Sequence, residues 1–85
     1  MEIFRDDVKN EFSVVVEGKM CRLRFRQVDE RTVDFFSTFV PSELRGRGIA
    51  GRLVEFAVHD ARGRGLTIIP TCSYVRAWLE REGGG

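Results

Sequence analysis

The feature that most constrains the fold is a change of hydrophobic period at Pro41. Before it, residues 32–40 are rich in β-branched and aromatic side chains, which is typical of a β-strand. After it, apolar residues recur at intervals of three and four, the spacing of one buried helix face, at Ile49, Leu53, Phe56, Ala57 and Ala61. A second apolar run follows at residues 66–69. The order strand, helix, strand predicts a right-handed βαβ crossover with two parallel strands.

The residues before this unit alternate between apolar and polar side chains, as in an antiparallel sheet. Residues 12–16 and 20–28 predict the two strands of a hairpin with its turn at Gly18, and a short edge strand is expected near Phe4. Aromatic residues on both sides of the run 32–40 predict that this strand is covered on both faces.

A last helix is predicted over residues 73–82, where Val75, Trp78 and Leu79 share one face. The predicted fold class is therefore α+β, with a mixed, mostly antiparallel sheet, one central βαβ crossover and a short C-terminal helix. The chain has 85 residues, of which 42% are hydrophobic, and this predicts one domain over residues 1–82. The glycines at 83–85 predict a flexible tail.

Charge and cysteine content argue against several function classes. The 14 basic residues against 13 acidic ones leave a net charge of +1, which gives no general attraction to nucleic acid or to a membrane surface. No run approaches the ~18 apolar residues of a membrane helix. Cys21 and Cys72 stand far apart, without the spacing of a disulfide framework or a zinc site. We expect free thiols, no metal, and a cytoplasmic protein that is a monomer or a weak dimer.

Three arginines lie at alternate positions of the second hairpin strand, at Arg22, Arg24 and Arg26, and therefore share one face of the sheet. A row of cations of this kind is most often a solvated surface. It is also suited to contact with an acidic protein or, weakly, with nucleic acid. Sheets that bind RNA carry aromatic residues for base stacking, and arginines alone do not indicate a nucleic-acid partner.

The junction between the strand at 32–40 and the following helix is rich in glycine and arginine. Helix N-termini present backbone N–H groups without intrahelical partners, and the helix dipole favours an anion there. Gly46 and Gly48 let the backbone approach a bulky pyrophosphate, and Arg45 and Arg47 can add charge-assisted hydrogen bonds. The spacing matches neither a P-loop nor the dinucleotide-binding fingerprint. It predicts either a phosphate site or a glycine-rich turn whose arginines are solvated.

The same junction carries a recognisable motif. The run "RGRGIA", residues 45–50, matches the signature Gln/Arg-x-x-Gly-x-Gly/Ala of GCN5-related N-acetyltransferases, and it lies between a strand and a helix as that signature does. From about residue 12 to residue 79, the chain resembles the minimal single-domain, YjdJ-type acetyltransferase-like subfamily, through "FVPSELRGRGIAGRLVEFAVHDA" and "TIIPTCSYVRAWLE". The resemblance implies an acetyl-CoA-dependent N-acetyltransferase that acts on an amine of a small molecule or on a protein lysine.

The resemblance also implies where coenzyme A binds. The pantetheine arm is expected in a gap between two diverging strands, hydrogen-bonded to the backbone of Phe39 and Val40. The pyrophosphate is expected on the backbone amides at the helix start, at Arg45, Gly46, Arg47, Gly48, Ile49 and Ala50. Arg76, one turn into the last helix, is expected to reach a phosphate of the nucleotide.

Cys72 is the candidate catalytic residue. It is expected just past the second crossover strand and at the start of the last helix, where the dipole favours a thiolate. Three roles remain open: an acyl-accepting nucleophile, a thiol that lines the cofactor pocket without a covalent step, and a small packing residue. Ser73 is expected to cap the last helix or to contact the cofactor.

Two departures from the family pattern favour a non-catalytic alternative. Relatives often place a His just before the Thr near the end of the first crossover strand, where this chain has Ser37. His59 is expected on an exposed helix face, which leaves Asp34 and Glu43 as candidate bases. The helices that full-sized members carry between their first two strands are also missing, so the acceptor pocket is expected to be shallow or completed by a partner. The alternative function is a coenzyme A- or acetyl-CoA-binding module that acts as a sensor or adaptor.

Overall fold

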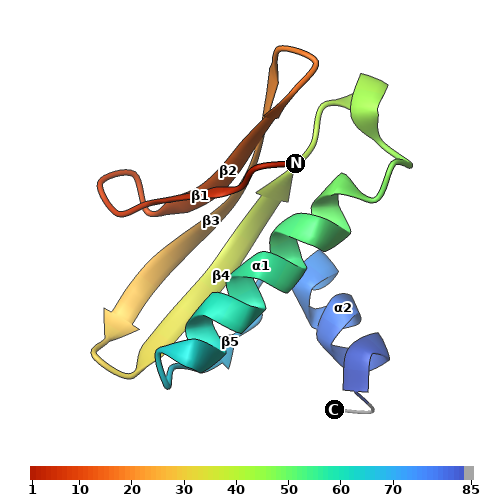
Figure 1. Cartoon of the computed structure of the whole chain (residues 1–85). Helices are drawn as coiled ribbons and strands as arrows, with labels where there is room; N and C mark the ends of the chain where they lie inside the picture. The colour runs from red at the N-terminus through yellow and green to blue at the C-terminus, as the bar shows by residue number, and fades with distance from the viewer. Residues whose placement is uncertain (84–85) are drawn as a thin grey trace.

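The sheet has five strands, and its first four strands follow one another along the chain as antiparallel neighbours. In the computed structural model, which describes residues 1–83, the strands are β1 (Phe4–Asp6), β2 (Glu11–Val16), β3 (Lys19–Asp29), β4 (Thr32–Phe39) and β5 (Thr67–Ile69). Helix α1 (Ile49–Gly63) connects β4 to β5, which pairs with β4 in parallel (Figure 1). Helix α2 (Ser73–Gly83) follows β5. The predicted α+β class, the mostly antiparallel sheet and the single βαβ crossover are confirmed.

The β2–β3 hairpin closes on a two-residue turn. Glu17 and Gly18 have φ angles of 51° and 76°, and a turn with positive φ at both central residues matches the right-handed twist of the flanking strands. The register runs from Val16 opposite Lys19 to Glu11 opposite Arg24. Alternate residues of β3 therefore lie on opposite faces of the sheet, as the sequence predicted.

The core lies between one face of the sheet and α1. Most of the largest buried side chains come from three strands and from the helix face toward them, and include Phe12, Leu23, Phe35, Leu53, Val54 and Val58. The ring of Phe12 lies 6.3 Å from that of Phe35, edge to face. Phe56 was predicted in this core but is 42% exposed. It lies at the rim of the helix face, edge-on to Phe12, because the neighbouring positions Val54 and Val58 fill the centre.

The opposite face of β4 differs from the prediction. Phe36 and Phe39 are 39% and 51% exposed, so the expectation that this strand is covered on both faces was wrong for its C-terminal half. The register with β3 shifts between Arg24 and Phe25, and Phe36 is the extra residue of a β-bulge. Beyond the bulge, Ser37 lies opposite Arg24 on the face away from α1. No helix in residues 1–83 covers these side chains.

Helix α2 packs its first turn into the core through Val75, which is fully buried, and Trp78 and Leu79 are partly buried against the core as predicted. The helix includes Gly83, one residue of the predicted tail, and residues 84–85 lie outside the described residues. A short 3₁₀ helix, η1 (Ser42–Leu44), takes the place of the loop expected after β4. In the described part of the chain, no helix has the length and apolar character needed to cross a membrane.

Candidate functional site

Strand β4 has an open edge over its C-terminal half. Its pairing with β5 ends at Asp34 and Ile69, and the last contact is the backbone N–H of Cys72, which donates to the Phe35 carbonyl at 2.9 Å. Its pairing with β3 continues to Phe39, and Figure 1 shows β4 extending beyond β5. Within residues 1–83, backbone groups on this edge have no strand partner past Phe35. The predicted backbone contacts at Phe39 and Val40 lie at the end of this edge.

The start of α1 has the backbone conformation of an anion-binding nest. Gly46 and Gly48 have φ angles of 84° and 80°, whereas Arg47 between them does not have a positive φ. Alternation of this kind turns successive N–H groups toward one concave side. A Cβ at either glycine would meet no atom within 4 Å, so the backbone here is not covered by other side chains at these two positions.

The backbone N–H groups of residues 46–51 have no hydrogen-bond acceptor among the described residues. The first intrahelical bond runs from the Arg52 N–H to the Gly48 carbonyl at 3.1 Å, and the N-cap Gly48 has no side chain to cap the helix. A helix start leaves four such groups by itself, and the nest adds those of Gly46 and Arg47. Donors clustered at the positive end of a helix dipole fit a diphosphate.

The two arginine side chains of the motif have protein partners. Arg45 Nε donates to the Val40 carbonyl at 3.0 Å and ties the nest to the end of the β4 segment. The Arg47 guanidinium forms an ion pair with Glu17 in the β2–β3 turn. The candidate anion site therefore consists mainly of backbone amides, with Arg45 beside it.

Two cavities open at this junction, with volumes of about 270 and 260 Å³. They share four lining residues: Val40, Arg45, Ala50 and Tyr74. The first also reaches Leu44, Gly46, Gly48 and Ile49, and the second reaches Thr38. The structure thus brings six of the predicted cofactor residues to one place. Phe39, Arg47, Ser73 and Arg76 do not line these cavities.

Cys72 lies at the start of α2 and beside the second cavity. Its sulfur is 3.5 Å from the hydroxyl of Thr38, and its carbonyl accepts the first helical hydrogen bond, from the Arg76 N–H at 3.0 Å. Burial opposes ionisation of this thiol, but the Thr38 hydroxyl and the backbone N–H groups of Val75 and Tyr74 together outweigh burial. The pKa of Cys72 is consequently lowered from its ordinary value.

The N-cap of α2 is Cys72, so the expectation that Ser73 caps this helix was wrong. Ser73 is the first residue inside the helix, and its side chain is exposed. The guanidinium of Arg76 turns back to the end of β5, where it donates to the Pro70 carbonyl at 3.3 Å. A contact with a nucleotide phosphate would require Arg76 to leave this partner.

Comparisons with known proteins identify the family of this chain. A family model described as GCN5-related N-acetyl-transferase matches residues 11–83. This chain belongs to the GCN5-related N-acetyltransferase family. The matched range includes both the nest and Cys72.

Relatives of this GCN5-related N-acetyltransferase include Protein NATD1 from Xenopus tropicalis, 32% identical over 84 residues, which cover 96% of this chain and 77% of that protein. Protein NATD1 from Mus musculus is 31% identical over 84 residues, which cover 96% of this chain and 76% of that protein. The NMR solution structure of a GCN5-like protein from Staphylococcus aureus aligns with a TM-score of 0.75 at 29% identity, over 98% of this chain and 81% of that chain. These matches support the family without separating its YJDJ-type subfamily from other members.

Tyr74 is a candidate site residue that could not be identified from the sequence. Its side chain lines both cavities, and its hydroxyl lies 3.6 Å from the position that a Cβ on Gly51 would take. The first turn of α2 therefore meets the first turn of α1 across the cavity. The available signal was the position of Tyr74 two residues after Cys72, on a helix that starts at the same sheet edge as α1.

The candidate bases lie outside the two cavities. His59 is exposed on α1, as predicted. Asp34 is 4% exposed, and its Oδ2 accepts from Arg26 at 2.9 Å. The Thr71 hydroxyl and then Arg26 lower the pKa of Asp34 despite burial. Asp34 Oδ1 has no hydrogen-bond partner among the described residues. The exposed Glu43 pairs with Lys19 at 3.5 Å.

No group of three or more His, Cys, Asp or Glu side chains suited to a metal ion is found in residues 1–83. Cys21 and Cys72 are both free thiols, and Cys21 is buried in the core.

Proposed function

We propose that this GCN5-related N-acetyltransferase binds acetyl-CoA at the start of α1 and transfers the acetyl group to an amine. The observation that carries the proposal is the set of unpaired backbone N–H groups at residues 46–51, next to the open edge of β4. A diphosphate requires several donors within a small space, and a helix N-terminus that continues a glycine nest provides them. Acetyl-CoA is the acyl donor used by the family, which supports the same assignment.

The open edge of β4 supports the position of the pantetheine arm. An extended chain with amide groups can add to a free strand edge as a further strand would. Thr38 and Val40 border both this edge and the cavity next to the nest. The Val40 carbonyl already accepts from Arg45, and a carbonyl oxygen has a second lone pair for a ligand donor.

Bound acetyl-CoA would supply an activated acetyl thioester. The protein must then hold an amine near it, stabilise negative charge on its oxygen and provide a proton for the departing coenzyme A thiolate. Unpaired backbone N–H groups on the β4 edge are suited to the second task. Tyr74 is suited to the third, because its phenolic O–H lines the same cavity as Thr38 and Ala50.

Cys72 is proposed to line the thioester pocket without becoming acylated. Its sulfur contacts the Thr38 hydroxyl and lies near the first amides of α2, which stabilise a thiolate. Acylation would convert this sulfur into a weaker acceptor and would weaken those contacts. Intact mass measured after incubation with acetyl-CoA is expected to show no added acetyl group. A stable adduct that maps to Cys72 would instead assign it as the nucleophile.

The direct test of acetyl transfer is the release of coenzyme A thiol from acetyl-CoA with a panel of amines: polyamines, peptides with free N-termini, and lysine-containing peptides. We expect thiol release that depends on the amine and matches the amount of acetylated amine found by mass spectrometry. Tyr74→Phe is expected to lower the rate and leave acetyl-CoA affinity nearly unchanged. Failure of every amine would contradict the enzymatic proposal.

We place the activity in the cytoplasm, a location supported by the two free thiols.

The alternative is a non-catalytic module that binds coenzyme A or acetyl-CoA as a sensor or adaptor. One observation favours it: no imidazole or carboxylate among the described residues lines the two cavities at the nest. The two functions separate cleanly, because the module would bind acetyl-CoA with the same amide contacts but release no thiol with any amine. Absence of acetyl-CoA binding would contradict both.

A further inference from the structure

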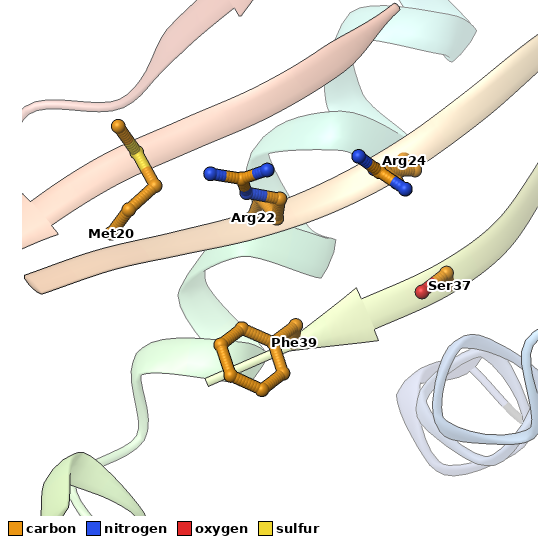
Figure 2. Close-up of a pocket in the computed structure, with 5 residues that line it drawn as sticks. All are labelled: Met20, Arg22, Arg24, Ser37 and Phe39. Carbon is orange, nitrogen blue, oxygen red and sulfur yellow. The ribbon is translucent and has the colours of Figure 1, made fainter. Parts of the chain in front are cut away.

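A third cavity lies on the face of the sheet away from α1. It has a volume of about 440 Å³, and we call it the arginine pocket after its lining residues Met20, Arg22, Arg24, Ser37 and Phe39. Figure 2 shows the two arginines and Met20 on β3, with Ser37 and Phe39 across from them on β4. Met20 and Phe39 are among the exposed large hydrophobic residues. The pocket therefore combines positive charge with apolar surface.

The charge of the arginine pocket is only partly neutralised. Arg22 Nη1 and Arg24 Nε lie 3.9 and 3.8 Å from the same oxygen, Oε1 of the buried Glu11. One carboxylate thus forms ion pairs with two guanidinium groups, both at the outer limit of ion-pair distance. Neither guanidinium has a side-chain hydrogen bond to another described residue. Arg26, outside the pocket, differs because it donates to Asp34 at 2.9 Å. The pocket keeps one net positive charge and unused N–H donors.

Strand β4 separates the arginine pocket from the proposed cofactor site. Ser37 and Phe39 line the pocket, whereas Thr38 and Val40 line the cavities at the nest. This follows from the alternation of side chains along a strand. A ligand in the arginine pocket would therefore lie about one strand width, roughly 5 Å, from the open edge where the thioester is proposed to lie.

We propose that the arginine pocket selects the acceptor, and that the acceptor is an acidic peptide segment that presents a lysine or an N-terminal amine. The proposal rests on the acetyltransferase function proposed above. Guanidinium groups bind carboxylates through paired, charge-assisted hydrogen bonds, and Arg22 and Arg24 have donors to spare. Met20 and Phe39 contact the apolar parts of the segment. The pocket lies on an uncovered sheet face, which suits an extended polypeptide better than an enclosed metabolite.

The test compares lysine peptides that differ only in the residues flanking the lysine: glutamates, glutamines or arginines. With acetyl-CoA, the glutamate peptide is expected to have a kcat/KM about tenfold above that of the glutamine peptide. The arginine peptide is expected to be the poorest, and the glutamate preference is expected to shrink as salt is raised. Equal rates for the glutamate and glutamine peptides would overturn the proposal.

Three double variants assign the preference to the pocket. Arg22→Gln with Arg24→Gln is expected to abolish the preference and leave acetyl-CoA affinity unchanged. The matched control, Arg31→Gln with Arg81→Gln, removes the same charge from exposed arginines outside the pocket and is expected to retain the preference. Since the first variant leaves Glu11 buried without a cation, Arg22→Lys with Arg24→Lys serves as a folded substitute that keeps the charge but loses paired bonding. It is expected to weaken the preference, and full retention would overturn the assignment.

A binding measurement separates this proposal from the proposed function. The glutamate peptide with a blocked N-terminus and norleucine in place of lysine has no amine to acetylate, and its binding is expected to shift the NMR signals of the Met20 methyl group and of Phe39. Binding with these shifts, but without turnover of the lysine peptide, would support the pocket and contradict the enzymatic function. No binding at low salt, or equal binding of the glutamine peptide, would overturn the pocket proposal whatever the turnover.

Discussion

The glycines of the nest provide a prediction at the scale of single residues. A Cβ has open space at Gly46, Gly48 and Gly63, but the first two have positive φ and Gly63 does not. Gly46→Ala and Gly48→Ala therefore cost about 1–2 kcal/mol of backbone strain and place a methyl group on the proposed diphosphate surface. We predict that each weakens acetyl-CoA binding about tenfold.

Gly63→Ala is the matched control for these variants. It adds the same methyl group near the end of α1, where the backbone is helical, and is predicted to stabilise the fold by up to about 1 kcal/mol with unchanged acetyl-CoA affinity. Calorimetric titration of the three variants provides the comparison. Equal affinities for all three would mean that the nest does not contact the cofactor.

The arginines of the motif differ in their expected effects. Arg47 is bound to Glu17 in an exposed ion pair, so Arg47→Gln is predicted to change acetyl-CoA affinity by less than about threefold. Arg45→Ala removes the hydrogen bond to the Val40 carbonyl that orders the nest, and is predicted to cost about 1–2 kcal/mol of binding. Calorimetric titration with acetyl-CoA measures both effects. A tenfold loss for Arg47→Gln would show that its side chain reaches a phosphate.

The pKa values of the two cysteines are shifted in opposite directions. Burial raises the pKa of Cys21, whereas the polar groups around Cys72 outweigh burial and lower its pKa. A group whose pKa is lower in the folded state than in the unfolded state stabilises the fold. This stabilisation is complete above the unfolded pKa, about 8.5 for a cysteine, and is lost as the pH falls through the folded pKa. We predict that the unfolding free energy of wild type minus that of Cys72→Ser grows as the pH rises toward the unfolded pKa of about 8.5.

Denaturant unfolding at a series of pH values measures this difference, and the contribution of Cys21 cancels because both proteins contain it. A difference that stays constant or falls with pH would contradict the assignment. Iodoacetamide is also expected to modify Cys72 before Cys21, because Cys21 is fully buried.

At the scale of elements, β1 is held to α1 by a partly buried ion pair. Arg5 Nη1 lies 2.7 Å from Asp60 Oδ2, and the guanidinium covers the rings of Phe12 and Phe25. Arg5→Ala is predicted to lower the unfolding free energy by about 2–3 kcal/mol, since it removes a charged hydrogen bond and packing together. Arg62→Gln breaks the more exposed pair with Glu82 and is predicted to cost less than about 1 kcal/mol. Similar losses in the two unfolding curves would contradict this ranking.

The elements were largely predictable because each depends on local patterns. The period change at Pro41 and the glycine at the hairpin turn act over a few residues, and the structure follows them. The predictions were wrong where tertiary packing determines whether a side chain is buried. Phe36 and Phe39 look like core residues in the sequence, but a bulge and the absence of a covering element within residues 1–83 leave them exposed.

At the scale of the whole molecule, the candidate site combines segments that lie far apart in the sequence. The nest was predictable because its glycines and the helix start are contiguous. The place of Tyr74 in the candidate site was not predictable, because Tyr74 reaches the cavity only when the first turns of α1 and α2 meet at the open edge of β4. The role of Cys72 as N-cap depended in the same way on where β5 ends. The arginine row was visible in the sequence, but its neighbours Phe39 and Ser37 followed only from the register of β4.

The central claim is that the unpaired amides at the start of α1 bind the diphosphate of acetyl-CoA while the edge of β4 binds the pantetheine arm. Titration of the ¹⁵N-labelled protein with acetyl-CoA, followed by NMR amide shifts, tests it most directly. The predicted result is saturable shifts for residues 46–51 and for Phe39 and Val40, with the amides of the β2–β3 turn nearly unmoved. Amides at 46–51 that stay in place at millimolar acetyl-CoA would contradict the claim.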